Sequence, residues 1–117
     1  MRLILVQLSI FSAKWARLGL TDEDLRLIEY SLLENPEAGS VIPGTGGLRK
    51  LHFAPASRHV GKRGGFRLIY AFIPAGQSVY LFTFYGKNEQ SDLAPDEKRV
   101  FRQVLARLHH QHKSRPF

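Results

Sequence analysis

Cysteine is absent from this chain of 117 residues, which excludes disulfide bonds and thiolate metal sites. Long apolar runs are missing as well. The run at the N-terminus extends over four residues, from Leu3 to Val6, before Gln7 interrupts it. A secretory signal needs about 7–15 apolar residues and a membrane span about 18. We therefore expect a soluble, cytoplasmic protein without a membrane partner.

Acidic residues are scarce relative to basic ones. The chain has 10 Asp and Glu against 17 Lys and Arg, so its formal net charge is +7. Such an excess favours nucleic acid, an anionic membrane or an acidic protein as partner, and the alternative is a merely soluble basic protein. With 44% hydrophobic residues, the length fits a single domain over residues 1–117, with a polar tail from about 109 to 117.

Hydrophobic periodicity predicts the element order β-α-α-β-β-β-α. Strands are predicted over 2–8, 48–54, 66–73 and 78–85, and the last two form an antiparallel hairpin. Helices are predicted over 9–18, from Thr21 to Asn35-Pro36 and from about Pro95, with Ser9 and Thr21 as N-caps and Gly19 ending the first. This order predicts an α+β fold: an antiparallel sheet with helices packed mostly on one face, which leaves the other face free for chemistry.

The segment 44–93 combines strand-forming sequence with basic residues. Its only acids are Glu89 and Asp92, whereas its bases are Arg49, Lys50, His52, Arg58, His59, Lys62, Arg63, Arg67 and Lys87. Side chains alternate along a strand, so Lys50 and His52 share one face, and Arg67 is the one charge within an apolar strand. The non-functional alternative for Arg67 is a salt bridge to one of the few acidic residues. For Lys87 it is a solvated lysine in a turn.

Three histidines, His109, His110 and His112, lie close together near the C-terminus. They lack the helical i, i+4 spacing, together with a carboxylate, that a catalytic zinc site shows. We expect no metal site and no cofactor, and the histidines are read as part of a solvated tail or as a stray RNA contact.

Three separated motifs together resemble the RelE/HigB branch of type II toxin–antitoxin toxins. They read GTGGLRKLHFA, GKRGGFRLIYAF and FYGKNEQSDLAPDEK, and the likeness extends from Phe11 to about Leu105. The resemblance implies a RelE-like fold and a metal-independent endoribonuclease, an mRNA interferase that cuts messages in the ribosome and inhibits translation. It also implies a cognate antitoxin, which is expected to be a helix-turn-helix protein. The toxin would contact operator DNA only through this antitoxin.

Transfer of the family's motifs assigns roles to individual residues. The proposed catalytic set is Lys50, His52, Arg67 and Lys87: Arg67 stabilises phosphoryl charge, His52 or Lys50 is the base, and Lys87 is the proton donor or a second clamp. Asn88 stands where the founding member has a phosphate-holding arginine, and the family's catalytic tyrosine has no counterpart at positions 93–96. The residues expected to contact RNA are Arg49, Arg58, Lys62, Arg63, Tyr70, Tyr85 and Asn88, the tyrosines by stacking if they are exposed.

Two other functions compete with the nuclease. ParE-like proteins share the expected fold and inhibit DNA gyrase without cleaving RNA, and a non-catalytic RNA-binding module is the third reading. The polar sheet face with Lys50, His52 and Arg67, together with the Lys87 turn, favours the nuclease over the gyrase inhibitor. Toxicity on expression, relieved by a small acidic-faced partner, would exclude the RNA-binding module.

Overall fold

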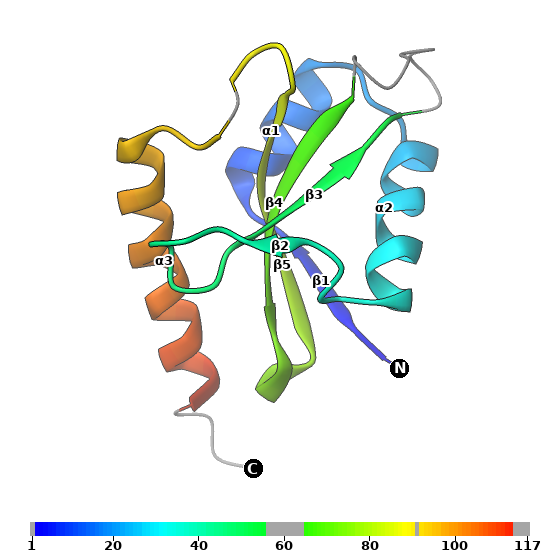
Figure 1. The fold of residues 1–117 in the computed structure, drawn as a ribbon. Coiled ribbons are helices and arrows are strands. Elements are labelled where there is room, and N and C mark those ends of the chain that lie inside the picture. Colours follow the sequence, from blue (N-terminus) through cyan, green and yellow to red (C-terminus); the bar gives the residue numbers. More distant parts are fainter. Residues whose placement is uncertain (1, 56–64, 91, 114–117) are drawn as a thin grey trace.

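A five-stranded sheet in the order β1-β5-β4-β3-β2 forms the centre of the molecule, in a computed structural model that describes residues 2–55, 65–90 and 92–113 (Figure 1). The elements are β1 (Ile4–Gln7), α1 (Ser9–Arg17), α2 (Asp22–Glu34), β2 (Ser40–Val41), β3 (Arg49–Phe53), β4 (Phe66–Ile73), the 3-10 turn η3 (Pro74–Gly76), β5 (Ser78–Gly86) and α3 (Pro95–Lys113). The α+β class and the predicted order are confirmed, with β2 as an addition.

The junction between α1 and α2 follows from short-range sequence signals. Gly19 adopts a φ of 68° just beyond α1, and the N–H groups of Gly19 and Leu20 donate to the carbonyls of Ala16 and Trp15, as in a Schellman motif. Thr21 then caps α2, because its hydroxyl accepts from Asp24 N at 3.1 Å while the Asp24 carboxylate accepts from Thr21 N at 3.1 Å. The cap predicted at Ser9 is wrong: Leu8 occupies that position and provides no side-chain cap.

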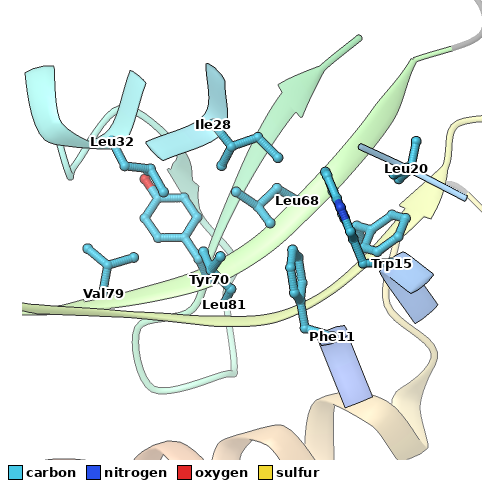
Figure 2. Packing of buried hydrophobic residues seen from close by; sticks show 10 residues of the cluster. Phe11, Trp15, Leu20, Ile28, Leu32, Leu68, Tyr70, Val79 and Leu81 are labelled. Atoms are coloured by element: carbon cyan, nitrogen blue, oxygen red, sulfur yellow. The ribbon is translucent and has the colours of Figure 1, made fainter. Parts of the chain in front are cut away.

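Helices cover both faces of the sheet. Figure 2 shows the first core, in which Phe11 and Trp15 of α1 and Ile28 and Leu32 of α2 pack on Leu68 and its neighbours. The second core lies on the opposite face, beneath α3 (Figure 1), and consists of Ile42, Leu48, Ile69, Ala71, Ile73, Phe82, Tyr85, Leu93, Phe101 and Leu105. The sequence predicted helices mostly on one face, and this holds for α1 and α2. α3 covers the other face, because that face of β4 is itself apolar over Ile69–Ile73 and requires cover.

Strand direction also differs from the prediction in one place. β3, β4 and β5 are antiparallel as expected, whereas β1 pairs with β5 in parallel, from Ile4 opposite Ser78 to Gln7 opposite Leu81. A parallel neighbour needs a long connection, and the chain between Gln7 and Ser78 supplies it through the helical pair and three other strands.

The C-terminal residues are more ordered than predicted. α3 continues to Lys113, and His112 Nε2 lies 2.8 Å from the Tyr80 hydroxyl, so the first part of the predicted polar tail is a helix that packs against β5. None of the helices in the described part of the chain is long and apolar enough to cross a membrane.

Candidate functional site

Three polar side chains lie side by side where the sheet is farthest from the η3 turn. In the strand register His52 of β3 is opposite Arg67 of β4, and Arg67 is opposite Tyr85 of β5. Lys50 lies two residues before His52 and hence on the same face. A depression of about 290 Å³ is lined by Ser40, Lys50, His52 and Arg67. The structure thus brings together three of the four residues proposed as catalytic.

A β-bulge brings Tyr85 to this face. Tyr70 is opposite Leu81 and Ile69 is opposite Thr83, so Phe82 is an additional residue in β5. The additional residue reverses the alternation. Before the bulge, odd-numbered side chains such as Leu81 face α1 and α2. After it, the even-numbered Phe84 faces these helices, and Tyr85 faces α3 and lies beside Arg67.

Among the described residues, no carboxylate forms an ion pair with the cations of this face. The four ion pairs among the described residues engage Lys14, Arg49, Lys98 and Arg99. No described carboxylate lies within ion-pair distance of Lys50, Arg67 or Lys87, so the salt bridge expected as the plain reading of Arg67 is not formed there. Unpaired guanidinium and ammonium groups that share one surface are suited to bind phosphate.

The surroundings of His52 in this cluster favour its neutral form. Burial, and then the charges of Arg67 and Lys87, lower the pKa of His52 from its usual value of 6.5. A neutral imidazole accepts a proton through its free ring nitrogen, as a general base must. At the rim, burial raises the pKa of Asp92, but the Leu93 N–H, the ammonium of Lys98 and the charge of Lys50 outweigh it and leave the pKa below its usual value.

Tyr85 presents a buried hydroxyl rather than an exposed ring. Its side chain is 2% exposed, and its hydroxyl has no hydrogen-bond partner among the residues that the structure describes. Burial and then the charge of Asp92 raise the pKa of this phenol, while Arg67 opposes them, so the hydroxyl keeps its proton. Stacking on a base, which requires exposure, is excluded for the ring in this conformation.

Tyr70 and Arg49, both predicted to contact RNA, lie outside the cluster. Tyr70 is fully buried in the core beneath α1 and α2 (Figure 2); its hydroxyl donates to Pro36 O and accepts from Gly39 N, each at 2.9 Å. Arg49 donates to Gly39 O at 2.8 Å and pairs with Glu37 at 3.2 Å. Both side chains hold the turn after α2, so neither is free for RNA.

The turn after β5 carries Lys87 and Asn88 at the surface. Both side chains are exposed, and Lys87 N donates to Gly65 O at 3.1 Å, which ties the turn to the start of β4 two residues before Arg67. The other predicted RNA contacts, Arg58, Lys62 and Arg63, lie outside the described residues.

One lining residue escaped the sequence prediction. Ser40 belongs to β2, which pairs with β3 through only two residues, Ser40 opposite Lys50 and Val41 opposite Arg49. A two-residue strand leaves no periodicity to detect. Within the described residues, no group of three or more His, Asp or Glu side chains is placed to hold a metal ion.

No family model matches this sequence. Among solved structures, a chain of the intact E. coli RelBE toxin–antitoxin complex is 23% identical with a TM-score of 0.53, and the match covers 76% of this chain and 100% of that one. E. coli RelE with two arginines replaced by alanine, in the free state, is 22% identical over 92% of this chain and 99% of its own, with a TM-score of 0.57. Isolated E. coli RelE is 18% identical over the same shares, with a TM-score of 0.52. The chain therefore has the fold of the RelE toxin.

Proposed function

We propose that this protein is the toxin of a type II toxin–antitoxin system and that it cleaves messenger RNA on the ribosome. The observation that carries the proposal is the cluster of Lys50, His52 and Arg67 on a RelE-like sheet, with Lys87 on the adjoining turn. None of these cations has a described carboxylate partner. An inhibitor that acts only through a protein surface has no need of a neutral histidine among unneutralised cations.

The chemistry proposed is transfer of the phosphodiester within the RNA. His52, or Lys50 in its neutral form, removes the proton of the ribose 2′-hydroxyl, and the resulting oxygen attacks the adjacent phosphorus. Arg67 donates two parallel hydrogen bonds to the phosphoryl oxygens as their charge grows. The bond to the 5′ oxygen breaks, and Lys87 supplies the proton that this oxygen takes. The products are a 2′,3′-cyclic phosphate and a free 5′-hydroxyl.

The partners follow from the proposed activity. The fold is shared with a chain of the RelBE complex, in which a toxin is bound to its antitoxin, and this supports a cognate antitoxin for the present chain. We extend the proposal to an antitoxin with a helix-turn-helix domain that contacts operator DNA on behalf of the pair, and to messenger RNA and the ribosome in the cytoplasm as the targets.

Induced expression followed by primer extension tests the function. Wild type is expected to stop growth and to produce cuts inside translated codons, whereas Arg67→Ala is expected to lower cleavage by about 10²-fold or more, because one preorganised donor is lost from the transition state. Arg26→Ala is the matched control: it removes the same charge from an exposed position on α2, away from the cluster.

The alternatives give different outcomes. If Arg67→Ala stays as toxic as wild type at equal expression, the assignment of the site is wrong. Intact messages together with an induced DNA-damage response would favour a ParE-like gyrase inhibitor. RNA binding without growth arrest would favour a non-catalytic module.

A further inference from the structure

Lys14 connects helix α1 to the point where β5 leaves the sheet. Its ammonium donates to Phe84 O at 2.6 Å, lies 3.5 Å from Glu89 Oε2 and sits 5.2 Å from the centre of the Phe84 ring. The Lys14 side chain is only 17% exposed. A lysine that is largely withdrawn from water needs such partners to remain charged, and a hydrogen bond from an ammonium is among the stronger ones in proteins.

Glu89 extends this connection into the turn that carries Lys87 and Asn88. One carboxylate oxygen faces Lys14, and the other accepts from Gly86 N at 3.2 Å. The backbone closes the same turn, because Glu89 N donates to Gly86 O at 2.9 Å. Each end of the Gly86–Glu89 turn is therefore fixed, one by β5 and the other by Lys14 through Glu89.

The fixed turn places the backbone of Lys87 beside the start of β4. Lys87 N is bonded to Gly65 O, next to the first residue of β4, and the charge of Lys87 is felt at His52. Lys14 itself is on the opposite side of the sheet, since α1 packs with Phe84 in the first core. It has no route to a substrate on the polar face and acts there only through the turn.

We propose that Lys14 and Glu89 are positioning residues of the nuclease site: they hold the Gly86–Glu89 turn so that Lys87 reaches the scissile phosphate together with Arg67. This inference rests on the proposed function. The Lys14–Glu89 ion pair alone contributes little to stability, because the Glu89 side chain is 52% exposed. The geometric consequence is larger, since a displacement of about 1 Å in a catalytic group lowers a rate by up to about 10²-fold.

The experiment measures cleavage of a translated message by Lys14→Met, Lys14→Arg and Glu89→Gln, with kcat and KM separated. Lys14→Met keeps the apolar stem and removes the ammonium, and it is expected to lower kcat about tenfold with little change in KM. Lys14→Arg, which still donates to Phe84 O, is expected to restore most of the rate. Lys113→Met removes the same charge from an exposed position at the end of α3 and is expected to leave cleavage unchanged.

A double-mutant cycle separates positioning from general stability. In a Lys87→Ala background the turn no longer presents an ammonium, so Lys14→Met is expected to add no further loss. Additive losses would overturn the proposal, and so would wild-type kcat in a folded Lys14→Met variant. Glu89→Gln keeps the inference testable if Lys14→Met fails to fold, because it removes only a charge at an exposed carboxylate.

Hydrogen exchange distinguishes failure of this inference from failure of the proposed function. If wild type cleaves no message, the proposed function falls, but the amides of Lys87 and Glu89 still report on the turn. Their exchange is expected to accelerate in Lys14→Met and to stay unchanged in Lys113→Met. Equal exchange in both variants would overturn the positioning role independently of activity.

Discussion

At the scale of single residues, His52 is a basic group surrounded by other basic groups. Burial, Arg67 and Lys87 all lower its pKa, so the folded protein binds fewer protons than the unfolded chain as the pH falls below 6.5. Above pH 6.5 the contribution of this histidine to folding stability is therefore fully present. It is lost as the pH falls through the pKa of His52 in the folded state. The same arrangement keeps the imidazole neutral, and suited to act as a base, at neutral pH.

The titration of His52 can be followed directly by NMR. The midpoint is expected below 6.5 in wild type and closer to 6.5 in Lys87→Ala, because a neighbouring positive charge has been removed. His52→Gln identifies the resonance among those of the five histidines. Arg26→Ala should leave the midpoint unchanged, and a wild-type midpoint above 6.5 would contradict the electrostatic account of the site.

The buried hydroxyl of Tyr85 can be tested separately for its effects on stability and on cleavage. Its buried hydroxyl has no described partner, so Tyr85→Phe is expected to leave the free energy of unfolding unchanged or to raise it by about 1 kcal/mol. Because the hydroxyl has almost no accessible surface, the same change is expected to leave cleavage at the wild-type rate. Urea denaturation and the cleavage assay measure the two effects. Loss of cleavage in a variant of wild-type stability would show that the hydroxyl reaches the substrate after all.

At the scale of elements, the sequence predicted features that depend on neighbouring residues and missed those that depend on tertiary contacts. The cap at Thr21, the αL residue Gly19 and the alternation in β4 were all predicted and are confirmed, because each depends on neighbours within a few residues. The side of the sheet covered by α3 and the parallel pairing of β1 depend on distant partners. No periodicity within a helix or strand contains that information.

The candidate site shows the same division. Alternation along β3 placed Lys50 and His52 on one face, and the register with β4 places Arg67 beside them. The bulge at Phe82 was not predicted, because a run of strand-forming residues looks the same with or without an additional residue. Lys14 and Glu89 were not linked either, since they are 75 positions apart and Lys14 lies outside the basic segment 44–93.

At the scale of the whole molecule, the charges are segregated. The sequence of α2, DEDLRLIEYSLLE, carries five acids and one arginine although the chain has a net charge of +7. The cations of the cluster lie instead on the face of the sheet shared with Ile69, which is the face that α3 covers and α1 and α2 do not. This segregation predicts that a polyanion approaches the polar sheet face rather than α2.

Salt dependence tests this segregation without requiring cleavage. Binding of a single-stranded RNA carrying 2′-O-methyl groups, which remove the attacking hydroxyl, is measured against salt concentration. Each cation that contacts a phosphate contributes about 0.7 to the slope of log K against log salt, so Lys50→Ala is expected to reduce the slope by about that amount. Arg26→Ala, on the acidic helix, is expected to leave the slope unchanged. Equal reductions in the two variants would mean that RNA responds to the net charge of the molecule rather than to this face.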